Sequence, residues 1–81
     1  MTSTPLKDFI KEVIANETGI KSSAIKDTQS FFELGIDSIT AVYLLELVEK
    51  KYEIELTPLY FWDYPTIEKF ADKVEQELRI K

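Results

Sequence analysis

The chain has 81 residues, a formal net charge of −5, and neither cysteine nor histidine. Its length allows one hydrophobic core and leaves little room for a deep active-site cleft, and the missing residue types exclude disulfides, ordinary zinc sites and Cys–His or Ser–His catalytic pairs. The acidic balance disfavours nucleic acid and anionic membranes as partners and suits proteins that present basic patches.

No apolar run approaches the length that spans a bilayer, and the first residues, Met1-Thr-Ser-Thr-Pro, lack the charged and apolar regions of a secretion signal. We therefore expect a single domain over residues 1–81, a soluble cytoplasmic monomer without membrane insertion and without catalytic activity of its own. Met1 and the short tails favour a free-standing protein.

The first predicted helix begins at Thr4-Pro5, with the threonine as a plausible N-cap and the proline at the first helical position. Gly19 follows the last periodic turn and is suited to end the helix. Between these two points the apolar residues recur at helical spacing and define one stripe: Leu6, Phe9, Ile10, Val13 and Ile14.

The helical period is lost between Ile20 and Asp37, where turn-forming serines, aspartates and a glutamine gather. So long a loop is unusual in a small domain unless it is functional or packs its own apolar residues inward. We expect an ordered loop, held against the core by its apolar side chains: Ile20, Ala24, Ile25, Phe31, Phe32, Leu34 and Ile36.

The second helix is predicted from Asp37-Ser38 to about Lys51. One stripe is expected to face the core, namely Ala41, Leu44, Leu45, Val48 and Tyr52. A second apolar set lies largely off that stripe, and in so small a domain it indicates a surface for partners: Ile39, Val42, Tyr43 and Leu47.

Residues 53–56 alternate like a strand but have no second strand to pair with, so they are predicted to form an extended connection. Thr57-Pro58 predicts a short third helix through about Trp62, and Pro65-Thr66 introduces the last helix. The last stripe is Ile67, Phe70, Ala71, Val74 and Leu78. The prediction is an all-α fold, a small four-helix bundle with three main helices, a short third helix and a long loop between helices 1 and 2.

The string Leu34-Gly35-Ile36-Asp37-Ser38-Ile39 is the most informative for chemistry. Glycine allows a sharp turn before the helix, and Asp37 or Ser38 can cap its first amides. A serine there presents its hydroxyl at the positive end of the helix dipole, where a phosphate is favoured and unpaired amide donors lie nearby. On these residues alone, ordinary helix capping is the favoured explanation.

Residues 35–39 resemble the G-x-D-S-[LI] signature of phosphopantetheine-binding carrier domains, the acyl and peptidyl carrier proteins. Ser30-Phe31-Phe32-Glu33-Leu34 is similar to the loop that precedes their modified serine. Trp62-Asp63-Tyr64-Pro65-Thr66-Ile67 resembles the string that opens their last helix. The three strings occur in the order and spacing of that family and cover nearly the whole chain.

The resemblance implies that Ser38 receives a covalent 4′-phosphopantetheine arm from coenzyme A. A phosphopantetheinyl transferase would install it with magnesium, and its thiol would hold an acyl group as a thioester. Asp37 matches the acid that assists transferase recognition, and Ile39 matches an exposed apolar contact residue. Val42, Tyr43 and Glu46 fall on the same helix face and complete the expected partner-recognition set.

The implied function is an acyl carrier that serves acyl-loading and condensing enzymes of fatty-acid, polyketide or related biosynthesis. The Trp62–Ile67 string and the cations Lys50 and Lys51 favour polyketide-type carriers over the fatty-acid carrier, whose second helix is strongly acidic. The alternatives are a peptidyl or aminoacyl carrier and an unmodified helical protein-interaction module.

Two other candidate sites are weaker. Asp27, Glu33 and Asp37 lack the oxygen-ligand spacing of a calcium loop, so we expect them to be solvated loop acids and predict no metal site. The remaining candidate is a cluster of aromatic residues that could line a pocket: Tyr60, Phe61, Trp62 and Tyr64. We expect instead that Phe61 or Trp62 fills the core while the two tyrosines stay half exposed.

Overall fold

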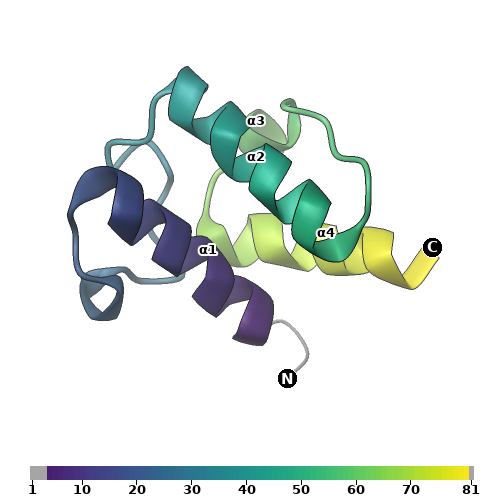
Figure 1. The fold of residues 1–81 in the computed structure, drawn as a ribbon, viewed down its shortest axis with the longest axis horizontal. Helices are drawn as coiled ribbons and strands as arrows, with labels where there is room; N and C mark the ends of the chain where they lie inside the picture. Colours follow the sequence, from purple (N-terminus) through teal and green to yellow (C-terminus); the bar gives the residue numbers. More distant parts are fainter. Residues whose placement is uncertain (1–3, 81) are drawn as a thin grey trace.

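The computed structural model describes residues 4–80 and shows a small helical bundle (Figure 1). Its helices are α1 (Thr4–Thr18), α2 (Ser38–Tyr52), α3 (Tyr60–Asp63) and α4 (Ile67–Ile80), with one 3-10 turn, η1 (Ser22–Ala24), in the long loop. This confirms the predicted all-α class, the three main helices and the short third helix. Residues 1–3 and 81, which the single-domain expectation includes, lie outside the described residues, as does the side chain of the predicted cap Thr4.

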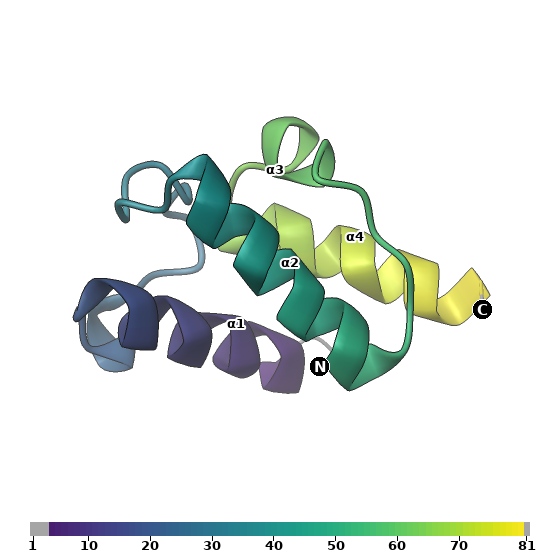
Figure 2. The same cartoon turned by 45° about the horizontal axis from the view of Figure 1, so that its top comes forward.

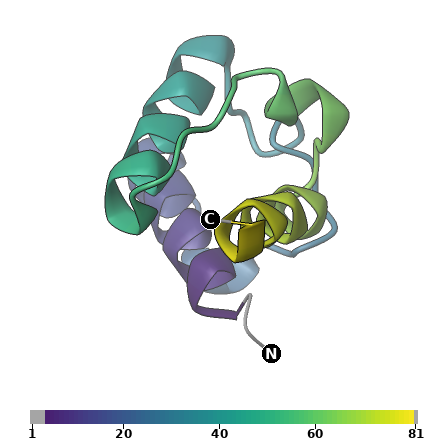
Figure 3. The same cartoon turned by 90° about the vertical axis from the view of Figure 1, so that its right-hand side faces the viewer.

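The helices surround one interior (Figures 2 and 3). Viewed along the long axis, α1 and α2 lie on one side and α3 and α4 on the other, while the long loop closes the end of the bundle away from the C-terminus. Every helix and the loop contribute to the core. Its buried residues are Leu6, Ile10, Val13, Ile14, Ile25, Phe31, Leu34, Ile36, Ala41, Leu44, Leu45, Val48, Ile54, Phe61, Ile67, Phe70, Ala71 and Val74.

Helix α1 ends where the sequence predicts. Gly19 adopts a φ of 81°, in the left-handed region that glycine enters without steric cost, and its N–H donates to the Ala15 carbonyl at 2.9 Å. The Thr18 hydroxyl donates to the Ile14 carbonyl and accepts from the Ile20 N–H. The last turn is therefore closed by local hydrogen bonds, and the chain leaves it directly into the loop.

The long loop is ordered, but only part of its apolar set is buried. Ile25, Phe31, Leu34 and Ile36 belong to the core, whereas Ala24 is exposed and the Phe32 side chain is 49% exposed. The expectation that both phenylalanines hold the loop inward is therefore wrong for Phe32. Backbone pairing with the segment before α4 decides the difference, because the Phe31 N–H donates to the Pro65 carbonyl at 2.9 Å and directs that side chain inward.

The same loop caps α4. The Ile67 and Glu68 N–H groups donate to the carbonyls of Gln29 and Asp27, at 3.4 and 2.9 Å. The Thr66 hydroxyl accepts from the Lys69 N–H at 3.2 Å. The first amides of α4, which have no acceptor within the helix, are therefore hydrogen-bonded to the loop and to Thr66. This fits the predicted role of Pro65-Thr66 in introducing this helix.

Helix α3 is shorter than predicted. Thr57 and Pro58 form a turn instead of the first helical turn, because their carbonyls accept from the N–H groups of Tyr60 and Phe61, three residues on. This tighter pattern delays the α-helical geometry until Tyr60. Phe61 then enters the core, and Trp62 remains 65% exposed. Of the two aromatics expected to compete for the interior, Phe61 fills it.

Three phenylalanines join the loop, α3 and α4. The rings of Phe61 and Phe70 stack with centroids 4.8 Å apart, and Phe31 meets both edge-on at 5.0 and 5.5 Å. Edge-to-face and offset-stacked contacts of this kind each contribute about 0.5–1.5 kcal/mol beyond burial. This cluster holds the four-residue helix α3, which is too short to be stable by its own hydrogen bonds.

Candidate functional site

Ser38 is the first residue of α2 and is exposed. The residue before it, Asp37, is the N-cap: its Oδ1 accepts from the Thr40 N–H at 2.8 Å, and its carbonyl accepts from the Ala41 N–H at 2.8 Å. The sequence left the cap open between Asp37 and Ser38, and the structure assigns it to Asp37. The helix start therefore does not need the Ser38 hydroxyl as its cap.

The Asp37 carboxylate dominates the electrostatics at this helix start. The Thr40 N–H donates to the Asp37 carboxylate and holds the pKa of that group below its ordinary value. The Asp37 carboxylate engages the Thr40 amide, and the Ala41 amide makes the ordinary first intrahelical bond to the Asp37 carbonyl, so the donors expected near a phosphate on Ser38 are the amides that precede Thr40. A phosphate there would still lie at the positive end of the α2 dipole, beside an ionised carboxylate.

The turn before Ser38 has a defined shape. Gly35 has a φ of 84°, a conformation that side chains disfavour, and the Ile36 N–H donates to the Phe31 carbonyl at 3.0 Å. Ser30 and Glu33 form a reciprocal capping box, in which each side chain accepts from the backbone N–H of the other, at 3.0 and 2.9 Å. The [ST]-x-x-[DE] spacing of Ser30 and Glu33 is the sequence signal for such a box, which was not among the predictions.

An exposed apolar face surrounds Ser38. We define it by six side chains that are 39–81% exposed: Phe32 in the loop, Ile39, Val42 and Tyr43 on α2, and Leu59 and Trp62 beside or in α3. Glu46 is also exposed on α2. The residues predicted from the sequence to recognise partners, namely Asp37, Ile39, Val42, Tyr43 and Glu46, are thus all exposed on α2 or at its start, and their role stays a prediction. Leu47 is not part of this face, because its half-buried side chain packs against the core.

Ser38 also lines a small apolar groove of about 70 Å³. Its rim includes the rings of Phe32 and Trp62, whose centroids lie 5.2 Å apart at an interplanar angle of 34°. The sequence did not reveal this groove, because its walls come from the loop, α2 and the segment around α3. The lining residues are Phe32, Ser38, Ala41, Val42, Pro58, Phe61 and Trp62.

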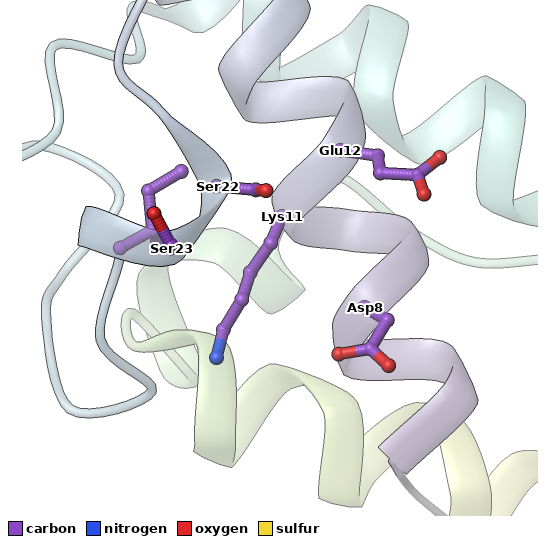
Figure 4. Close-up of a pocket in the computed structure, with 6 residues that line it drawn as sticks. Asp8, Lys11, Glu12, Ser22 and Ser23 are labelled. Atoms are coloured by element: carbon purple, nitrogen blue, oxygen red, sulfur yellow. The ribbon is translucent and has the colours of Figure 1, made fainter.

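A second hollow, of about 370 Å³, lies between α1 and η1 and is polar. Figure 4 shows Asp8, Lys11 and Glu12 on α1 and Ser22 and Ser23 on η1, with the Lys11 side chain extending away from the Glu12 carboxylate. Because Lys11 forms an ion pair with a loop residue, it has a structural role there.

That loop residue is Asp27, whose carboxylate lies 2.5 Å from the Lys11 ammonium and 3.5 Å from that of Lys7. The hydrogen bond from Lys11, followed by the positive charges of both lysines, lowers the pKa of Asp27. Asp27 binds α1 through its side chain and α4 through its carbonyl. Glu33 and Asp37 accept hydrogen bonds from backbone amides, so each of the three loop acids has a partner within the protein, whereas we expected only solvation. Residues 4–80 contain no group of three or more potential metal ligands.

Comparison with known families identifies the class of protein. Residues 8–74 match the family described as "Phosphopantetheine attachment site". A free-standing peptidyl carrier protein from Acinetobacter baumannii is 33% identical, with a TM-score of 0.82 over 89% of this chain and 90% of that one. The HMG-ACPI domain from the CurA module of Lyngbya majuscula is 29% identical, with a TM-score of 0.79 over 89% of this chain and 73% of that one.

Curated relatives are much longer proteins. Polyketide synthase 1 of Metarhizium album is 32% identical over 96% of this chain but only 4% of the synthase. Malformin synthetase mlfA of Aspergillus sclerotiicarbonarius is 36% identical over 86% of this chain and 1% of the synthetase. The chain thus spans a few per cent of the curated relatives that it matches.

The chain belongs to the phosphopantetheine-binding carrier family, with the acyl and peptidyl carrier fold. It contains a phosphopantetheine attachment site and is a non-catalytic carrier domain, whose homologues are carrier regions of polyketide and peptide-type synthases. None of the helices in residues 4–80 has the length and apolar character that crossing a membrane requires.

The residues around the start of α2 fit the group that the family implies. The Ser38 side chain is exposed, it heads a helix of 15 residues, and Asp37 provides the cap independently of it. Modification of this hydroxyl therefore removes no stabilising contact that caps the helix. The adjoining apolar groove offers a surface for a flexible substituent.

Proposed function

We propose that Ser38 is the attachment point of the 4′-phosphopantetheine arm. The observation that carries the proposal is the exposed serine at the first position of α2, preceded by the cap Asp37 and the left-handed Gly35. Attachment forms a bond between Ser38 Oγ and phosphorus while the pyrophosphate P–O bond of coenzyme A breaks. The hydroxyl proton passes to a base, and adenosine 3′,5′-bisphosphate leaves.

The chain's own residues present the hydroxyl to a transferase. Gly35 and the buried neighbours Leu34 and Ile36 shape the turn, and Asp37 holds the first amides of α2 so that Ser38 starts a rigid helix. Asp37, ionised at neutral pH, offers a charge that a basic transferase can recognise. When bound, the arm supplies a thiol, which this cysteine-free chain lacks, to hold the carried group as a thioester.

The apolar face that surrounds Ser38 is proposed as the docking surface for partner enzymes. Ile39, Val42 and Tyr43 project from α2 with 81%, 39% and 45% of their side chains exposed, and Glu46 extends the face with a negative charge. Contacts with a partner would bury apolar area that now faces water, which favours association. The partners are a phosphopantetheinyl transferase and the enzymes that load and condense the carried group.

The carried group is proposed to be an acyl intermediate of polyketide biosynthesis. The curated relatives named as polyketide synthases support this assignment. A peptidyl or aminoacyl group is the second candidate, favoured by the 33% identity to a peptidyl carrier protein over nearly the full length of both chains. Comparative loading of holo protein by acyltransferases and by adenylating enzymes distinguishes the two.

The attachment test uses the purified apo protein, coenzyme A, magnesium and a broad-specificity transferase, with intact mass as the readout. One phosphopantetheine mass is expected on the parent chain and on Ser23→Ala, an exposed serine on η1 that serves as the matched control. Ser38→Ala should acquire none. Addition that persists in Ser38→Ala contradicts the assignment, and no addition to a folded parent chain favours an unmodified interaction module.

Docking is tested separately on the holo protein. Tyr43→Glu places a charge on the apolar face and should weaken transfer to a partner enzyme. Lys69→Glu, which alters an exposed position on α4, should not have this effect. Equal loss in both variants would point to a change in net charge instead of a local contact.

A further inference from the structure

The groove beside Ser38 has features that a partner surface alone does not explain. The serine is itself one of the lining residues, and the other lining side chains are apolar. Phe32 and Trp62, which form one rim, leave 49% and 65% of their side chains in water although they contact each other. An occupant attached at Ser38 would therefore meet an apolar surface directly beside its attachment point.

The size of the groove suits a small apolar group. About 70 Å³ is available, several times the space that one water molecule needs, so the groove admits groups of methyl size. Phe61, which lines the groove, is itself packed against the rings of Phe31 and Phe70 in the core.

We propose that this groove binds the geminal dimethyl group of a phosphopantetheine arm on Ser38. This inference depends on the attachment proposed above. The dimethyl carbon is separated from the phosphate by a single methylene, so it is the apolar part of the arm nearest to Ser38, whereas the amides beyond it are polar. A covalent tether holds it close to the groove at an effective concentration in the millimolar range or above, so weak apolar contacts suffice to populate the bound state.

The α3 side of the groove is held in place before any arm arrives. Tyr60 and Tyr64 contact each other edge-on at 5.8 Å, and the Lys73 ammonium of α4 lies 5.4 and 5.9 Å from their ring centroids. Glu77 forms an ion pair with Lys73 at 3.1 Å. Together with Phe61 in the core, these contacts fasten α3 to α4, so the dimethyl group meets a wall that requires little rearrangement.

The test is nuclear magnetic resonance of the holo protein, with intact mass confirming that the arm is attached. If the dimethyl group lies against the Trp62 and Phe32 rings, both geminal methyl resonances shift upfield from their positions in free coenzyme A. They also show nuclear Overhauser contacts with the indole ring and with the Val42 methyls. Trp62→Ala should remove most of the upfield shift, while Tyr43→Ala, an exposed aromatic that does not line the groove, should retain it.

The two proposals fail in different ways. Absence of the arm by mass overturns the attachment at Ser38. A fully loaded protein whose methyl resonances stay at the free coenzyme A positions, without contacts to Trp62 or Val42, overturns the groove while leaving the attachment intact. An upfield shift that survives Trp62→Ala and vanishes in Tyr43→Ala also contradicts the assignment, because it places the methyl groups on the outer face of α2.

Discussion

Two adjacent aromatics on α3, Phe61 and Trp62, should lose very different amounts of stability on truncation to alanine. Phe61 is 3% exposed and stacks on Phe70 at 4.8 Å, whereas Trp62 is 65% exposed and lies at the groove rim. Phe61→Ala opens a cavity among the loop, α3 and α4 and removes the main attachment of a four-residue helix. Trp62→Ala removes a ring that is largely in water.

The expected magnitudes differ several-fold. Truncation of a buried phenylalanine costs about 3–5 kcal/mol, and a surface substitution stays within about 0.5 kcal/mol. A domain of 81 residues has a total stability of about 4–12 kcal/mol at the usual 0.05–0.15 kcal/mol per residue. Phe61→Ala therefore removes a large part of the total. Phe61→Leu, which preserves most of the apolar volume, is the milder variant, at about 1.5 kcal/mol.

Urea unfolding followed by far-ultraviolet circular dichroism measures these differences, because that signal does not depend on the single tryptophan. With a slope of about 1 kcal/mol per molar urea, the Phe61→Leu midpoint should fall by about 1.5 M and the Trp62→Ala midpoint by about 0.5 M or less. The reasoning is refuted if Trp62→Ala is as destabilising as Phe61→Leu, since α3 would then present its opposite face to the core.

Three further outcomes are expected. Gly35→Ala should lower stability by about 1–2 kcal/mol in thermal or urea unfolding, because φ is 84° there while no atom lies within 4 Å of an added Cβ; an unchanged midpoint would mean that the turn relaxes freely. Because folding lowers the pKa of Asp27, its carboxylate stabilises the fold at pH values above the ordinary pKa of 3.8, and this contribution is lost as the pH falls through the lower folded-state pKa. Urea midpoints measured across that pH range should therefore fall less in Asp27→Asn than in the parent chain. Lys73→Met should increase acrylamide quenching of Trp62 fluorescence by loosening α3, and Arg79→Met, which removes the cation of another i,i+4 pair on α4, should not; equal quenching in both variants would exclude this role for Lys73.

Periodicity was sufficient to predict the three main helices, because the structure buries the apolar stripe of each one except for Phe9, Tyr52 and Leu78, which are partly buried against the core. On α2, Ala41, Leu44, Leu45 and Val48 are all in the core. Leu47 departed from the prediction, since it was expected on the partner face and packs against the core instead. Helical spacing alone does not distinguish the edge of a buried stripe from an exposed face when both are apolar.

The sequence did not predict which side chains of the loop are buried or where α3 begins. Phe31 and Phe32 are chemically identical neighbours, and their different burial follows from pairing of the Phe31 N–H with Pro65, more than thirty positions away. Thr57-Pro58 carries a local signal for a helix start, yet the structure forms a turn there and brings Phe61 into the core. Contacts distant in sequence decide both cases.

Of the candidate site, the residues that are close in sequence could be predicted, and the groove could not. Asp37, Ser38 and the exposed residues of α2 are close in sequence, so local patterns and the family resemblance were enough to predict their grouping. The groove brings together Phe32, Val42 and Trp62 from three separate segments. No local pattern links these positions, and the groove becomes visible only when the segments are placed in space.

The most direct test of the central claim is peptide mapping by tandem mass spectrometry of the protein isolated from its native host. Trypsin is expected to release residues 27–50 as one peptide, with Ser30 and Ser38 as its only serines. Fragment ions should place one phosphopantetheine on Ser38 and none on Ser30, whose hydroxyl takes part in the capping box. An unmodified peptide 27–50, or an arm located on any other residue, would contradict the assignment of Ser38 as the carrier serine.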